Sequence, residues 1–205
     1  MAYIFKVLES AKANLNQLKL EKQAFFAALT CEKMLPAYQL FSKEANWGNP
    51  SILEEILILL YEFINGNEIN MNQIKDLESE LEINAPDLDE IENSFASYGL
   101  DACAAFDESL SFILTKNIDH LVNIVSSATN IVDMCVQEKE SLEPSDKDLE
   151  IKIENDPFMQ KELKRQETII KALQDIELNS QTIAKLRKLN NYMGEMLDFS
   201  LLPYR

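Results

Sequence analysis

Apolar residues recur every three or four positions along most of this chain, which is the spacing of one face of an α-helix. One stripe occupies Leu20, Ala24, Ala27, Ala28, Cys31, Leu35 and Tyr38. Another occupies Leu121, Ile124, Val125, Ala128, Ile131, Val132 and Cys135, after Asn117 as the helix N-cap. Residues 52–64 are apolar on nearly every side of a helix, which predicts a central position for that segment.

Caps, prolines and glycines mark the ends of the predicted helices. Asn49-Pro50 predicts a helix start, and Asn65-Gly66-Asn67 predicts the end of that helix. Pro36 either kinks the helix that it lies in or begins the next segment. Further helices are predicted over residues 71–81, over 87–96, over 100–114 after Tyr98-Gly99, and in one long C-terminal stretch from Asp156-Pro157 to Met193-Gly194.

These elements predict an all-α fold, a compact multi-helix bundle of seven or eight helices. Only 4 glycines and 6 prolines occur, so the chain has few of the residues that tight β-turns require. The length of 205 residues fits a single domain over residues 1–205. We expect residues 142–155 to form a charged connector, and the apolar C-terminal tail, 195–205, to pack on its own core or on a second copy.

The charge balance limits the partners of such a bundle. The chain carries 35 acidic and 19 basic side chains, for a net charge of −16. Nucleic-acid binding requires clustered Lys and Arg, and anionic membranes attract basic faces, so we expect neither partner. The stretch over residues 76–92 holds eight acids and no base. It is either a solvated face or a surface that docks a basic partner.

We expect a cytoplasmic location. The chain begins without the basic head and long apolar run of a secretory signal, and its most apolar stretch, 56–61, is far short of the ~20 residues of a membrane span. The three cysteines, Cys31, Cys103 and Cys135, are widely separated and form no Cys-x-x-Cys pair. A reducing compartment is the simplest setting for them.

The usual motifs for cofactors and metals are missing. All four glycines are isolated, so no glycine-rich loop can cradle a phosphate. The single histidine, His120, has Asn117 three residues before it, so the Glu-x-x-His motif of carboxylate metal sites fails. Single cysteines beside Ala or Leu are typical of a core rather than of zinc ligands. We expect no cofactor and no metal.

Two blocks of residues resemble a known family. The run Phe-Phe-Ala-Ala-Leu-Thr-Cys-Glu-Lys-Met-Leu-Pro-Ala-Tyr at residues 25–38 is followed by Trp47-Gly48-Asn49, and Gly-Leu-Asp-Ala-Cys stands at 99–103. A weaker block covers residues 145–149 and 155–157. Together they resemble the YjaG-like bacterial family, domain of unknown function 416. The resemblance implies a small, all-helical, cytoplasmic bacterial protein and implies no activity. Lys33 stands where the family more often has arginine.

The blocks also contain the candidate site. On a helix Glu32 is rotated from the Cys31–Tyr38 face by roughly 100° and would flank a groove that Asp101 and Cys103 approach. We therefore take Glu32, Tyr38, Asp101 and Cys103 as candidate ligand-binding residues. Two simpler interpretations stay open: Asp101 caps its helix, and Glu32 pairs with a neighbouring base.

Two functions follow from these features. The first is a non-catalytic protein-interaction or regulatory module that works through its acidic helical surface and its apolar tail, with a protein partner or a second copy. The alternative is a helical bundle that binds a small molecule or a metal ion, including an enzyme, with its site at the four candidate residues.

Overall fold

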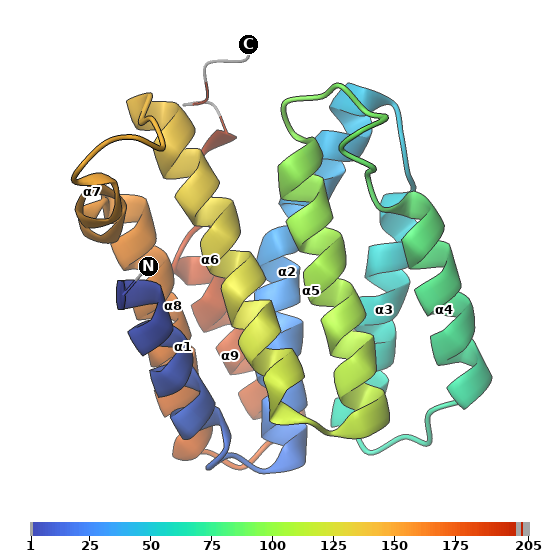
Figure 1. Cartoon of the computed structure of the whole chain (residues 1–205). Helices are drawn as coiled ribbons and strands as arrows, with labels where there is room; N and C mark the ends of the chain where they lie inside the picture. The colour runs from blue at the N-terminus through green and yellow to red at the C-terminus, as the bar shows by residue number, and fades with distance from the viewer. Residues whose placement is uncertain (1, 200–201, 203–205) are drawn as a thin grey trace.

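Helices make up most of the computed structural model, which describes residues 2–199 and 202 (Figure 1). Within these residues there are nine helices and no strand: α1 (Ala2–Leu15), α2 (Leu20–Ala45), α3 (Pro50–Ile64), α4 (Met71–Asn84), α5 (Ala96–Thr115), α6 (Ile118–Glu140), α7 (Leu149–Asn155), α8 (Pro157–Gln174) and α9 (Ser180–Tyr192). The all-α prediction is confirmed. The predicted count of seven or eight helices is slightly too low.

Helix α2 lies at the centre of the bundle and contacts α3, α5, α6 and α8 (Figure 1). Its inward side chains include Phe25, Phe26 and Phe41, all fully buried. The helix continues through Pro36 to Ala45, so the proline lies inside it and does not begin a new segment. The central position predicted for 52–64 is not found: α3 buries seven of its residues but leaves one face, with Ile58 60% exposed, in contact with water.

The start of α5 differs from the prediction. No helix forms over 87–96, because the side chains of Asp87 and Asn93 accept backbone N–H groups two residues further on and hold this stretch in turns. Helix α5 begins at Ala96 and runs through Gly99. Its Gly99 faces the Phe41 ring of α2, so this glycine permits close packing of the two helices and does not end one.

The prediction of a single C-terminal helix from Asp156 to Met193 is also wrong, because the structure has two helices there. Helix α8 ends at Gln174, and α9 starts at Ser180 after a new N-cap. Asn179 accepts the N–H groups of Gln181 and Thr182, while Thr182 Oγ1 accepts the N–H of Asn179. This capping box starts a helix in a new direction. The predicted end at Met193-Gly194 is confirmed.

The predicted connector and the predicted C-terminal tail both pack on the bundle. The connector at 142–155 contains α7, whose Ile153 is buried against the bundle. In the tail, Met196, Leu197 and Leu202 are 5%, 3% and 4% exposed. The Phe199 ring lies edge-on to Phe95 and Tyr98. The described tail residues therefore pack on their own chain; the rest of the predicted tail (200, 201 and 203–205) lies outside the described residues.

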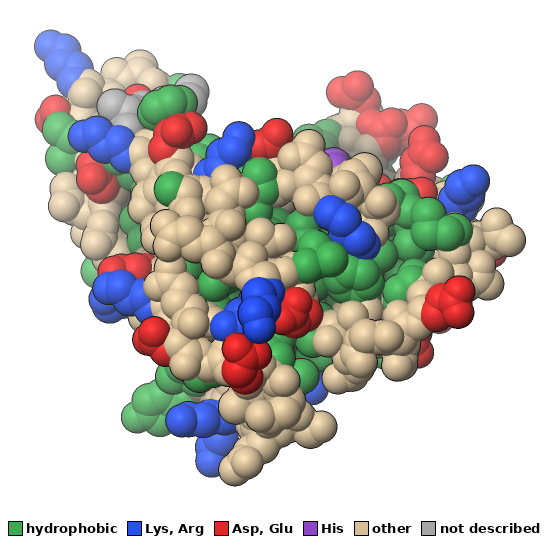
Figure 2. Space-filling view, turned by 90° about the horizontal axis from the view of Figure 1, so that it is seen from below, with side chains coloured by type: hydrophobic (Ala, Val, Ile, Leu, Met, Phe, Trp, Pro, Cys, Tyr) green, Lys and Arg blue, Asp and Glu red, His purple; other side chains and the backbone are tan. Residues whose placement is uncertain are grey.

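The surface is not uniformly acidic. On the underside of the bundle, hydrophobic side chains gather in one area, and Lys and Arg alternate with Asp and Glu around it (Figure 2). None of the described helices combines the length and apolar character needed to cross a bilayer.

We expect Gly99→Ala to destabilise the protein, although alanine normally favours a helix over glycine by about 1 kcal/mol. A Cβ at residue 99 would lie 2.7 Å from Cδ1 of Phe41, so the ring must move. Overpacking of this kind costs about 1–3 kcal/mol, which urea unfolding monitored by circular dichroism would measure. In a double-mutant cycle, Gly99→Ala combined with Phe41→Ala should cost less than the sum of the two single changes; strict additivity would contradict the contact.

Candidate functional site

Glu32, the first of the four candidate residues, pairs with a base. Its Oε1 lies 2.6 Å from Nη2 of Arg187 on α9 and accepts the Tyr61 hydroxyl of α3 at 2.8 Å. The Arg187 guanidinium lies 4.8 Å from the centre of the Tyr61 ring. The structure thus confirms the simpler interpretation of Glu32, an ion pair with a neighbouring base.

Tyr38 and Cys103 lie deeper, on the side that faces α4. The Tyr38 hydroxyl donates to the backbone oxygen of Asn84 at 2.7 Å. Cys103 is buried, and this burial raises the pKa of its thiol to about 12. Cys103 is close enough to contribute to the raised pKa of Tyr38. Both groups therefore stay protonated at neutral pH.

Asp101 points towards α6. It is the sixth residue of α5, so it is not the helix cap. Its carboxylate accepts a long hydrogen bond, 3.4 Å, from Nδ2 of Asn130, and burial raises its pKa to about 6. Asp101 and Cys103 are two residues apart on α5, which corresponds to a rotation of roughly 200° about the helix axis. Their side chains therefore point to opposite sides of the helix. Tyr38 and Cys103 share one environment, whereas Glu32 and Asp101 each face different neighbours. The joint role of the four residues as a ligand site stays a prediction.

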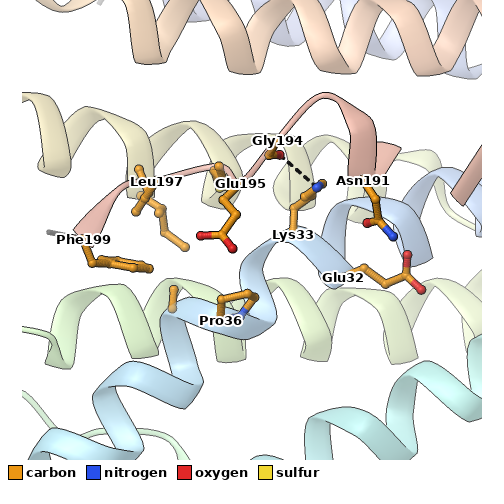
Figure 3. Close-up of a pocket in the computed structure, with 11 residues that line it drawn as sticks. Glu32, Lys33, Pro36, Asn191, Gly194, Glu195, Leu197 and Phe199 are labelled. Atoms are coloured by element: carbon orange, nitrogen blue, oxygen red, sulfur yellow. Dashed lines mark hydrogen bonds between the residues drawn. The ribbon is translucent and has the colours of Figure 1, made fainter. Parts of the chain in front are cut away.

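A cavity of about 290 Å³ lies between α2, α6 and the segment after α9, and we term it the Lys33 cavity (Figure 3). Its polar lining is Glu32, Lys33, Asn191 and Glu195; its apolar lining includes Pro36, Ala37, Ile131, Met196, Leu197 and Phe199. The α2 residues belong to the block that carries the family resemblance. Lys33 Nζ donates to the backbone oxygen of Gly194 at 3.0 Å, which holds the wall of the cavity against α2.

Lys33 lies in an unusual electrostatic position. Loss of hydration lowers the pKa of its ammonium, and the nearby guanidinium of Arg165 lowers it further. The carboxylates of Glu162 and Glu195 act in the opposite direction without forming a salt bridge to it.

Behind the cavity lies a buried ionic network that the sequence analysis missed. The side chains of Arg165 and Glu162 are 3% and 2% exposed, and two N–H groups of the arginine bond the carboxylate at 2.6 and 2.7 Å. Gln166 donates to Glu162 at 2.7 Å, and Arg165 donates to Asn190 of α9 at 3.2 Å. Asn190 in turn donates to the backbone oxygen of Leu29.

A sequence signal for this network existed. The apolar face of α8 occupies Met159, Ile169, Ile170 and Leu173, and the same spacing continued between them falls on Glu162, Arg165 and Gln166. Polar residues of opposite charge on the core face of a helix predict a buried ion pair.

A second depression, which we term the acidic groove, runs between α4 and α5 and has a volume of about 620 Å³. Its charged lining is Lys75, Glu78, Glu82 and Asp107, and its apolar lining is Leu81, Ala85, Leu100, Cys103 and Ala104. An adjoining depression shares Glu82, Ala85 and Leu100 and adds Asp87, Leu88 and Asp89. The pKa of Asp107 is raised by loss of hydration, by Glu108 and, more weakly, by Glu82.

Comparison with known proteins assigns the family. A family model described as "Protein of unknown function (DUF416)" matches residues 10–195. The chain belongs to the DUF416 family. "Uncharacterized protein YjaG" of Escherichia coli K12 is 27% identical over 180 residues, which are 85% of this chain and 89% of that protein. Its counterpart in Salmonella typhimurium LT2 is 26% identical over 164 residues, 80% of this chain and 81% of that protein.

A solved structure agrees with this assignment. The crystal structure of a DUF416 family protein from Shewanella baltica OS155 is similar, with a TM-score of 0.77 and 25% sequence identity over 89% of this chain and 94% of that chain. The family match covers the whole acidic groove of this DUF416 protein. It also covers the Lys33 cavity apart from Met196, Leu197 and Phe199.

No group of three or more His, Cys, Asp or Glu side chains in the described part of this DUF416 protein is placed to hold a metal ion. His120 Nδ1 lies 2.6 Å from Oε2 of Glu108, and the other oxygen of that carboxylate, Oε1, accepts from Nδ2 of Asn123.

We expect Arg165→Met to destabilise the protein by about 3–5 kcal/mol, because it leaves the Glu162 carboxylate buried without its partner. Lys171→Met on the same helix is the matched control. It removes an exposed pair with Glu167, and because water already solvates both charges it should cost far less stability than Arg165→Met. Urea unfolding of both variants measures the difference. Adding Glu162→Met to Arg165→Met should recover part of the loss; equal costs at residues 165 and 171 would contradict the role of the network.

Asp101 should make stability depend on pH. Because its folded pKa, about 6, is above the ~3.9 of an unfolded aspartate, its contribution is fully present below about pH 4 and is lost as pH rises through 6. We therefore expect Asp101→Asn to be more stable than the parent protein by about 1–2 kcal/mol at pH 8 and equal to it at pH 4. Urea unfolding at pH 4, 6 and 8 tests this; a difference that does not change with pH would refute it.

Proposed function

We propose that this DUF416 protein is a protein-interaction module and that the acidic groove docks a basic, amphipathic helix of a partner protein. The observation that carries the proposal is the combination of apolar and acidic side chains along the groove between the neighbouring helices α4 and α5. Five carboxylates, Glu78, Glu82, Asp87, Asp89 and Asp107, line the groove and its extension, against the single base Lys75.

The apolar residues of the groove provide the contact area. Leu88 and Leu100 are 49% and 37% exposed, whereas Leu81 and Cys103, which also line the groove, are buried. A helix laid into a groove between two helices buries side chains at positions i, i+3, i+4 and i+7, which is a common mode of recognition. An apolar stripe on the partner would cover Leu88 and Leu100.

The charges of the groove favour a basic partner. Loss of hydration is the main cause of the raised pKa of Asp107, and the negative charges of Glu108 and, more weakly, of Glu82 add to it. Lys and Arg side chains on the edges of a docked helix would relieve this repulsion and would also speed association.

Two further observations support contact rather than chemistry at this groove. The thiol of Cys103 keeps its proton because burial raises its pKa to about 12, so the groove offers no ready nucleophile. The described tail residues already pack on their own chain, so the proposed interaction rests on the groove and not on the tail. A cytoplasmic location, expected from three free cysteines, is part of this proposal.

We expect the triple variant Glu78→Gln, Glu82→Gln, Asp107→Asn to bind a basic amphipathic helix at least about tenfold more weakly than the parent protein. The probe is a fluorescently labelled peptide of leucine and lysine at helical spacing, and fluorescence anisotropy measures its Kd. Raising the salt concentration should weaken binding to the parent protein, because exposed charges are screened.

The matched control carries Glu9→Gln, Glu55→Gln and Glu143→Gln, three exposed acids outside the groove. Both triple variants lose three negative charges, so an attraction to net charge alone would weaken binding equally in both. Equal loss in the two variants would contradict the groove as the docking site. So would the absence of any peptide binding by the parent protein.

A further inference from the structure

The Lys33 cavity lies apart from the acidic groove and has a different character. Leu197 and Phe199 lie at one end, as Figure 3 shows. Lys33 and Asn191 lie at the other end, and Glu195 lies between Lys33 and Leu197. A cavity with one apolar and one charged end suits a small amphiphilic molecule.

The ammonium of Lys33 has unused hydrogen-bonding capacity. It carries three N–H donors, and one of them bonds the Gly194 backbone oxygen. Within the described part of the chain no carboxylate lies within 4.0 Å of Nζ. A partly buried ammonium with a single neutral acceptor is stabilised by an added anion, and a carboxylate is the small organic anion that a lysine binds most simply.

The negative charge of Glu195 sets a second requirement for the ligand. Glu195 lines the cavity, and no described base lies within salt-bridge distance of its carboxylate; Lys161 bonds only its backbone oxygen. Glu32, by contrast, is already paired with Arg187. A ligand with a carboxylate alone would gain from Lys33 but would be repelled by Glu195, whereas a zwitterion satisfies both.

The size of the cavity limits the rest of the ligand. A volume of about 290 Å³ is at the small end of ligand sites and, at ~30 Å³ for each water-sized group, holds roughly ten non-hydrogen atoms. That fits a molecule the size of leucine. The apolar end then receives a branched or aromatic side chain.

We propose that the Lys33 cavity binds a free α-amino acid with an apolar side chain. Its carboxylate lies on Lys33, its ammonium lies on Glu195, and its side chain contacts Ile131, Leu197 and Phe199. Because the ligand would bridge α2 and the segment after α9, occupancy would also hold that segment in place.

Isothermal titration calorimetry of the whole chain with L-leucine, L-methionine and L-phenylalanine tests this proposal. At least one should bind with a Kd on the order of 0.1–1 mM, as expected for so few atoms. Two analogues of leucine dissect the head group: 4-methylpentanoate lacks the ammonium, and isoamylamine lacks the carboxylate. Each should bind at least about tenfold more weakly than leucine.

Variants locate the site. Lys33→Met should weaken amino-acid binding by about tenfold or more, and Glu195→Gln, which keeps the shape of the side chain, should weaken it by several-fold. Lys188→Met, which removes an equal charge from an exposed position of α9 outside the cavity, should bind as the parent protein does. Circular dichroism and the Tm confirm that each variant is folded, and Glu195→Gln tests the site even where Lys33→Met fails to fold.

Three results would overturn the proposal. The first is no heat of binding for any of the three amino acids at tenfold above the expected Kd. The second is 4-methylpentanoate or isoamylamine binding as tightly as leucine. The third is a folded Glu195→Gln variant with unchanged affinity. None of these results bears on the acidic groove, so the two proposals fail or survive separately.

Discussion

The guanidinium of Arg165 is held by both oxygens of the Glu162 carboxylate in a place from which water is excluded. A charge in such a place is tolerated only when its N–H groups find acceptors, and here the remaining ones reach Asn190 of α9 and Thr30 of α2. The pair therefore joins α8 and α9 to α2, which is more than 100 residues earlier in the chain. If any of these helices shifted, a buried charge would lose its hydrogen-bond partner. The ion pair therefore favours one relative position of α2, α8 and α9.

The position of the C-terminal segment depends on that register. Asn190, in the last turn of α9, bonds the backbone of α2. After the helix ends, the chain turns at Gly194 and passes beside Lys33. Met196 and Leu197 are then buried, and the Lys33 cavity is the space left between this segment and α2. The cavity thus exists because a buried ionic network places one wall and a hydrophobic tail closes it.

The acidic groove has a different structural basis. It lies where α4 rests on α5 through a narrow apolar stripe, Ile74, Leu77 and Leu81, with acidic residues on either side of that stripe. Because α4 buries only these three residues, part of the neighbouring surface of α5 stays exposed beside it, and we call this strip the margin. Carboxylates outnumber the single base, Lys75, along this margin, whereas the underside of the bundle mixes both signs (Figure 2).

The pattern of apolar residues was sufficient to predict the helical class, the stripe of α6, the cap at Asn117 and the helix end at Gly194, because each depends on contacts within a few residues. It failed at 87–96 and at 175–179, where Asx turns and a capping box compete with helix formation over a distance of two or three residues. Only the tertiary structure decided that Gly99 is a contact point for Phe41, and that Glu32, Asp101 and Cys103 face different neighbours. It also decided that Glu162 and Arg165 meet in the core. The reason is physical: a helix face can be read from spacing, but which charge lies opposite which, and whether water lies between them, depends on how separate helices are packed.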